Sequence, residues 1–271
     1  MGTVFSFDIR DPATPAIETA LGEAVAWLHR VDALFSTYRP GSQISRLGRG
    51  ELTLAECDPE VAEVLRLCRG VGHRSGGAFT ASPGGRLDPS GMVKGWATER
   101  ASRILYAAGA RHHLVNGGGD LQARGGSGPG RPWRCGIADP WRGGEVAAVV
   151  SGRDLAVATS GTAERGDHIL DPATGRPPTA LVSITLVGRH LTEVDALATA
   201  AFVKGERARD WVGSLPGVEA FALTADGRAW WTPGFAAVGG VPSVAAVSSA
   251  AMSEVGAGGR GGDTDPGGVR P

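Results

Sequence analysis

Hydrophobic residues recur along this chain with two different periods. Between Ile17 and Phe35, apolar side chains return every three or four positions and fall on one face of an amphipathic helix. The same period predicts three more helices, over Asp58–Arg69, Trp96–Ala108 and Asp195–Val203. Four helices of ordinary length are therefore expected.

Shorter segments rich in β-branched and aromatic residues predict strands. They cover Val4–Ile9, His113–Val115, Leu121–Arg124, Trp133–Ala138, Glu145–Ser151, Leu155–Thr159 and Val182–Val187. A closing hairpin is expected from Ala220–Leu223 and Ala229–Trp231, because Asp226-Gly227 between them favours a tight turn. Helices and strands in this mixture predict a single α+β domain over residues 1–238.

Two glycine-rich segments interrupt these patterns. Asn116-Gly117-Gly118-Gly119-Asp120 predicts a tight turn between strands. It is not a dinucleotide-binding fingerprint, because the GxGxxG spacing is missing and no helix is expected after it. From residue 239 on, the chain is mostly Gly, Ser and Ala and offers too little apolar surface to offset the entropy of ordering. Residues 239–271 are therefore predicted to be a disordered tail.

Composition narrows the class of protein. The 271 residues include 27 basic and 28 acidic side chains, so net charge provides no reason to expect nucleic-acid binding. The three cysteines, Cys57, Cys68 and Cys135, form no CxxC pair, which argues against a zinc site or a disulfide framework. No signal peptide and no apolar run of membrane-spanning length is evident, so we expect a cytoplasmic protein with no membrane span.

The most informative chemistry lies around Asp195. Thr199 follows four residues later, so a helix would place both oxygens on one face, where they suit Mg²⁺. His168, on a separate segment, could act as a base. The run from Thr192 to Asp195 also fits an N-terminal capping box with Thr192 as the cap, and the two roles are compatible. A serine hydrolase using Ser160 is disfavoured, because the surrounding residues are not GxSxG.

Further motifs occur in a fixed order along the chain. They are MGT at residue 1, FSTYRPGSQISRL at 35, GGAF at 76, LDPSGMVKGWATERA at 87, LVNGGGDLQARG at 114, WRCGIADP at 133, AVATSGTAERGDHILDPATGRPP at 156 and VDALATAAFVKG at 194. In this ordered set the chain resembles the FAD:protein FMN transferase (ApbE-like) family from residue 1 to about 235. Each motif alone is weak, whereas the set is specific.

The resemblance implies a fold and an activity. The fold would be a T-fold-related α+β domain with mixed or antiparallel sheets and packed helices. The activity would be Mg²⁺-dependent transfer of the FMN half of FAD to a Thr or Ser hydroxyl of a target flavoprotein, through a phosphoester bond and with release of AMP. Two alternatives remain open: an FAD pyrophosphatase that yields FMN and AMP, and a non-catalytic FAD-binding protein. Many relatives are exported.

The resemblance also assigns roles to residues. Asp195, Thr199 and the carbonyl of Gly91 would bind the metal, and His168 would activate the acceptor hydroxyl. Contacts to FAD are implied for Met1, Tyr38, Ala78, Phe79, Thr80, Asp88, Lys94 and Ile169. The chain departs from the family pattern at Thr80, where an acidic residue is usual, and in the shortened segment 81–86.

Overall fold

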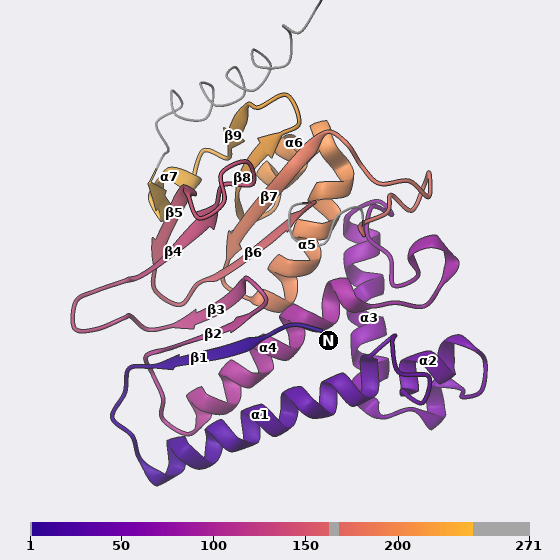
Figure 1. Ribbon diagram of the computed structural model, residues 1–271, viewed down its shortest axis with the longest axis horizontal. Coiled ribbons are helices and arrows are strands. Elements are labelled where there is room, and N and C mark those ends of the chain that lie inside the picture. Colours follow the sequence, from indigo (N-terminus) through magenta and orange to yellow (C-terminus); the bar gives the residue numbers. More distant parts are fainter. Residues whose placement is uncertain (1, 163–167, 241–271) are drawn as a thin grey trace, which may run out of the picture.

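The computed structural model describes residues 2–162 and 168–240. Within them, an antiparallel seven-stranded sheet has the order β1-β2-β3-β6-β7-β8-β9 (Figure 1). Its strands are β1 (Phe5–Ile9), β2 (His113–Gly117), β3 (Asp120–Arg124), β6 (Ala156–Gly161), β7 (Leu181–Gly188), β8 (Glu219–Thr224) and β9 (Ala229–Trp231). A smaller antiparallel sheet has the order β10-β5-β4, with β4 (Trp133–Ala138), β5 (Val146–Gly152) and β10 (Gly239–Gly240).

Helices α4 (Ser90–Ala107) and α5 (Leu191–Lys204) cover one face of the large sheet. The other helices are α1 (Pro15–Phe35), α2 (Gln43–Gly48), α3 (Pro59–Arg74), α6 (Ala208–Gly213) and α7 (Phe235–Val238), the last of which packs on the opposite side against β5, β8 and β10. The helix α4 packs against β2 and β3, while α5 lies beside it on β6 and β7. In turn, α1 packs against α4 (Figure 1). The expected α+β class is confirmed.

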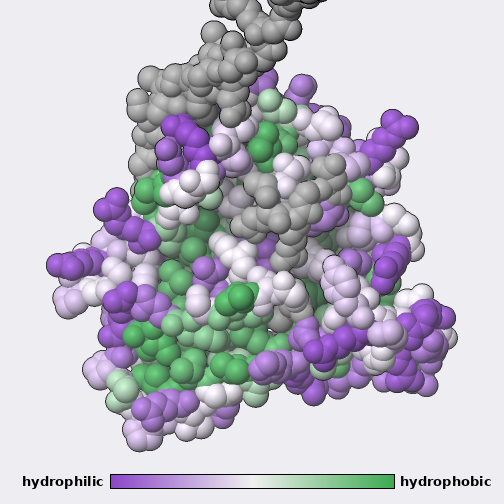
Figure 2. Space-filling model, viewed as in Figure 1, coloured by the Kyte–Doolittle hydropathy of each residue, from purple (hydrophilic) through white to green (hydrophobic). Residues whose placement is uncertain are grey.

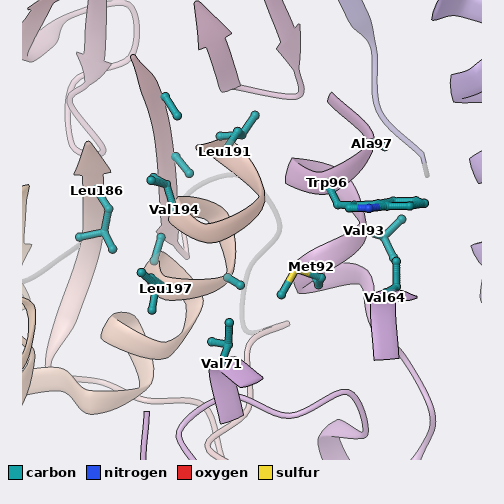
Figure 3. Packing of buried hydrophobic residues seen from close by; sticks show 14 of the residues in the cluster. Val64, Val71, Met92, Val93, Trp96, Ala97, Leu186, Leu191, Val194 and Leu197 are labelled. Carbon is teal, nitrogen blue, oxygen red and sulfur yellow. The ribbon is translucent and has the colours of Figure 1, made fainter. Parts of the chain in front are cut away.

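Strand alternation divides the apolar residues between two cores. On β6, Ala156 and Ala158 face the helices, while Val157 faces the small sheet. The helix-side core brings Met92 of α4 together with Leu191, Val194 and Leu197 of α5, while Trp96 lies on the other side of α4, against Trp27 of α1 (Figure 3). Trp133 and Ile137 of β4 belong to the second core. The large sheet is therefore buried on both faces, by the helices on one side and by the small sheet on the other. This packing can position residues from distant parts of the chain.

Helix boundaries depart from the periodic pattern. The helix α4 begins at Ser90 rather than Trp96, and α3 continues to Arg74 rather than ending at Arg69. Glycines lower the helix propensity of the first turns of α4, so that only its packing against α5 reveals the true start. The short helices α2 and α6 were not expected, because six residues are too few to display a period.

The expected capping box at Thr192 is wrong. Helix α5 begins at Leu191, and its N-cap is His190, whose side chain makes no capping hydrogen bond. Thr192 is thus the second residue of the helix, and its backbone N–H donates to Glu99 of α4. Asp195 accepts a hydrogen bond from Gly95 instead of forming a box. Packing against α4 has replaced the local cap.

The predicted turns are confirmed. Gly118 and Gly119 join β2 to β3 with positive φ, and Gly227 holds a φ of 80° in the turn of the β8–β9 hairpin. No helix follows the β2–β3 turn, as expected for a hairpin. Of the predicted tail, Gly239–Gly240 pair with β5 and residues 241–271 lie outside the described part.

Hydrophilic residues predominate around the edge of the molecule in the view of Figure 2. On the face in Figure 2, hydrophobic residues gather in the region that β1, α1 and α4 occupy in Figure 1. Phe5, Phe7 and Ile9 of β1 are partly buried there against the helix-side core. Among the described residues, no helix combines the length and apolar character needed to cross a bilayer.

Candidate functional site

A cavity of about 580 Å³ is lined by helices and by strands of both sheets. Its walls come from the segment after α1, the loop before α4, the first turn of α4, the β2–β3 turn, the strands β4 and β6, and one face of α5. A volume of this size is typical of small-molecule sites, which span roughly 300–1,000 Å³. The cavity therefore has room for a ligand of the nucleotide class.

The predicted site residues converge on this cavity. Those that line it are Tyr38, Ala78, Phe79, Thr80, Asp88, Gly91, Lys94, His168, Ile169, Asp195 and Thr199. Met1, also predicted to contact FAD, lies outside the described residues. Residues far apart in the sequence, such as Tyr38 and Asp195, thus line the same cavity.

Asp195 and Thr199 lie where α5 crosses α4. The side chain of Asp195 is 4% exposed, and its Oδ2 accepts a hydrogen bond of 2.8 Å from the backbone N–H of Gly95. The hydroxyl of Thr199 lies 3.5 Å from the hydroxyl of Ser160 on β6. A β-carbon built on Gly91 would come within 3.5 Å of the same Thr199 oxygen. Gly91, Asp195 and Thr199 therefore form one compact oxygen-rich corner.

Two carboxylates and one ammonium share this corner. Lys94 Nζ lies 2.5 Å from Asp120 Oδ2, and Asp120 Oδ1 accepts a hydrogen bond of 3.0 Å from the N–H of Thr159. Burial raises the pKa of Asp195, Lys94 lowers it, and the neighbouring Asp120 raises it again, with a net upward shift. The corner is thus short of positive charge when both carboxylates are ionised.

Asp120 was not predicted as a site residue from the sequence. It appeared only as the last residue of a glycine turn, whereas its side chain is 2% exposed and ion-paired inside the cavity. The available signal was the place of this acidic residue, directly after three glycines and at the start of a strand. A charged residue that is buried in a sheet needs a partner of opposite charge. Ser160 was weighed only as a nucleophile and instead adjoins Thr199.

The remaining predicted residues line the cavity around this corner. Tyr38 is 91% exposed, whereas Phe79 is 4% exposed and lies against Gly91. Asp88 accepts a hydrogen bond from the N–H of Ser90 at the start of α4. The hydroxyl of Thr80 accepts one from the N–H of Ser82, so this side chain stabilises a turn in the loop before α4. His168 is exposed at the cavity wall.

The oxygen-rich corner suits a divalent cation. The candidate donors are the Asp195 carboxylate, the Thr199 hydroxyl and the Gly91 backbone carbonyl, all hard oxygens. In a regular helix the N–H of Gly95 points to the carbonyl of Gly91, but here it also lies 2.8 Å from Asp195. A carbonyl has two lone pairs, so that of Gly91 retains acceptor capacity. Among the described residues no cluster of three His, Cys, Asp or Glu side chains offers a conventional metal site, so any ion here depends on this mixed donor set.

Comparison with known families identifies the chain. The model of the ApbE family matches residues 1–85 and 80–222. The chain belongs to the ApbE family. Curated relatives are named FAD:protein FMN transferase: the protein from Rhodobacter capsulatus is 38% identical over 165 residues, covering 57% of this chain and 31% of the relative. The protein from Escherichia coli K12 is 32% identical over 162 residues, covering 55% and 46%. This ApbE-family chain thus matches less than half the length of these two relatives.

Solved structures share the fold over most of the chain. The flavin transferase ApbE from Vibrio cholerae aligns with a TM-score of 0.76 and 22% identity, covering 88% of this chain and 96% of that one. The ApbE protein from Thermotoga maritima aligns with a TM-score of 0.77 and 23% identity, covering 87% and 98%. The architecture is therefore that of ApbE proteins.

Proposed function

We propose that this ApbE-family chain transfers the FMN half of FAD to a Thr or Ser hydroxyl of an acceptor flavoprotein, releasing AMP. The observation that carries the proposal is the corner of Gly91, Asp195 and Thr199 with Lys94 beside it, which opens into a cavity of about 580 Å³. Curated relatives that match over half of the chain are named FAD:protein FMN transferase.

The proposed site would hold Mg²⁺ through Asp195 Oδ, Thr199 Oγ1 and the carbonyl of Gly91. When bound, the ion would neutralise charge on a pyrophosphate and on the departing AMP. Lys94 would contribute a further positive charge, which its ion pair with Asp120 holds at the cavity wall. In this proposal the ion and Lys94 together supply positive charge beside the buried carboxylates of Asp195 and Asp120.

Other residues would bind and activate the two substrates. The exposed ring of Tyr38 offers an aromatic face for the flavin. An acceptor hydroxyl is a weak nucleophile and needs a base within hydrogen-bond reach. His168, exposed at the cavity wall, would accept that proton through an imidazole nitrogen.

The test is incubation with FAD, Mg²⁺ and a candidate acceptor protein. We expect AMP together with a covalently fluorescent acceptor. Asp195→Asn keeps the shape of the side chain but removes its charge, and should lower AMP release by at least about 100-fold. The control Asp210→Asn lies on the exposed face of α6 and should retain parent activity.

The products separate the alternatives. Release of AMP together with free FMN would indicate FAD hydrolysis instead of transfer. Bound FAD without release of AMP would indicate a binding protein. If Asp195→Asn released AMP at the parent rate, the proposed role of this aspartate would be wrong.

A further inference from the structure

The N-terminus of α5 is capped by side chains from two other elements. A helix leaves its first N–H groups without partners inside the helix, and here the side chain of the N-cap, His190, satisfies none of them. Instead, the N–H of Leu191 donates to Gln122 Oε1 of β3 at 3.0 Å. The N–H of Thr192 donates to Glu99 Oε2 of α4, also at 3.0 Å. The start of α5 is therefore fixed from outside.

Both capping side chains are buried and fully engaged. Glu99 is 1% exposed, and its other oxygen accepts hydrogen bonds from Arg103 at 2.6 Å and from His190 at 2.9 Å. Gln122 is 0% exposed, and its amide group donates to the carbonyl of Arg189 at 3.2 Å. Glu99 places a negative charge at the positive end of the α5 dipole. Gln122 contacts the backbone on both sides of His190, so it sets the position of the chain as it enters α5.

On α5 these caps lie one helical turn from Asp195, a proposed metal ligand, which follows Leu191 by four residues. On α4, Glu99 lies one turn after Gly95, whose N–H donates to Asp195, and two turns after Gly91. The two helices are consequently joined at two points, by Gly95 to Asp195 and by Glu99 to Thr192. Two such links fix both the sliding and the rotation of α5 against α4.

We propose that Glu99 and Gln122 are positioning residues that hold α5 so that Asp195 and Thr199 face Gly91. This inference rests on the proposed function, since it assigns these residues to the metal site of that reaction. Neither side chain lines the cavity, so both act through the helix rather than by touching a ligand. Loss of either cap shifts the ligand oxygens and weakens metal binding before it affects the chemistry.

The test uses Mn²⁺ as a probe, with the free ion followed by electron paramagnetic resonance in the absence of FAD. Glu99→Leu removes both acceptor oxygens and should raise the Kd for Mn²⁺ about tenfold or more. Glu99→Gln keeps one acceptor for Thr192 and should recover part of the affinity. Gln122→Leu should resemble Glu99→Leu. The Mg²⁺ concentration for half-maximal AMP release should rise in parallel, with kcat at saturating Mg²⁺ less affected.

A stability control separates positioning from general weakening. Leu28→Ala leaves a cavity in the core where α1 packs, away from α5. It should lower the melting temperature without changing the Kd for Mn²⁺. If Glu99→Leu and Gln122→Leu folded and bound Mn²⁺ as the parent does, the positioning role would be wrong. If Glu99→Leu failed to fold, Glu99→Gln and Gln122→Leu would decide the question. A parent that binds Mn²⁺ but releases no AMP would overturn the proposed function alone.

Discussion

At the scale of single residues, Gly95 decides how closely α4 and α5 approach. A β-carbon at this position would lie 2.5 Å from the carbonyl oxygen of Leu191 and 2.7 Å from Cβ of Asp195. Neither atom belongs to the end of a flexible side chain. The short contact is also what lets the N–H of Gly95 reach the Asp195 carboxylate. Glycine here is required by the neighbouring helix rather than by its own backbone angles.

We expect Gly95→Ala to destabilise the protein by about 1–3 kcal/mol, because the helices must separate to admit the methyl group. It should also weaken Mn²⁺ binding. Gly22→Ala is the matched control: it lies on α1 with no atom within 4 Å of the added carbon, and alanine favours helix. Urea unfolding measures both variants, and equal stability of the two would contradict the steric argument.

Lys94 is ion-paired with one buried carboxylate and interacts electrostatically with a second. Its side chain is 21% exposed, that of Asp120 is 2%, and Asp195 adjoins the pair. Lys94→Met should therefore lower stability by about 3 kcal/mol in chelator, because a buried charge loses its partner. Added Mg²⁺ should restore part of this loss. Arg228→Met, which breaks an exposed ion pair with Asp226, should leave the melting temperature unchanged with or without Mg²⁺. A loss in Lys94→Met that Mg²⁺ does not reduce would argue against an ion at this corner.

At the scale of elements, the junction of α4 and α5 depends on an ionised Glu99. Burial alone would raise the pKa of Glu99, but hydrogen bonds from Thr192, His190 and Arg103 outweigh it and lower the pKa to about 2. The folded pKa is thus below the ordinary value of 4.5. The resulting stability is fully present above pH 4.5 and is lost as the pH falls from there towards 2.

Glu99→Gln should therefore flatten the acid side of the stability profile. Between about pH 6 and about pH 3.5, the parent should lose roughly 1 kcal/mol more unfolding free energy than the variant, because only the parent must protonate this carboxylate on unfolding. Urea titrations across this range measure the difference. Parallel profiles would mean that Glu99 does not carry the shifted pKa.

At the scale of the whole molecule, the cavity lies where the helices, the large sheet and the small sheet meet. Its walls include Lys94 and Asp195 from the helical side, Leu121 and Val157 from the central sheet, and Ile137 from the small sheet. A ligand in this cavity would contact both cores at once. Binding should consequently stabilise the protein as a unit rather than one layer alone.

We expect FAD with Mg²⁺, at about 100 times the Kd, to add about 2.7 kcal/mol and to raise the melting temperature by roughly 5 °C or more. Differential scanning fluorimetry measures the shift. Asp195→Asn should lose the part that depends on Mg²⁺ while keeping the part due to FAD alone. An unchanged melting temperature in the parent would contradict ligand binding between the layers.

The sequence alone determined the local elements and part of the candidate site. Strand β4 and strand β9 have the predicted bounds, and the turn at Gly118-Gly119 follows from residues next to it in the chain. Such features depend on short-range periodicity and on glycine's conformational freedom, both of which are local. The spacing of Asp195 and Thr199 was readable for the same reason, because both lie on one helix.

How distant residues meet depends on the packing of the whole fold. This packing paired Lys94 with Asp120 and replaced the expected cap at Thr192 by Glu99, a residue 93 positions earlier. It also extended α4 back to Ser90, through glycines that favour no helix by themselves. The physical reason is that close packing of α4 against α5 and the sheet sets these contacts, and no local pattern in the chain encodes a distance between helices.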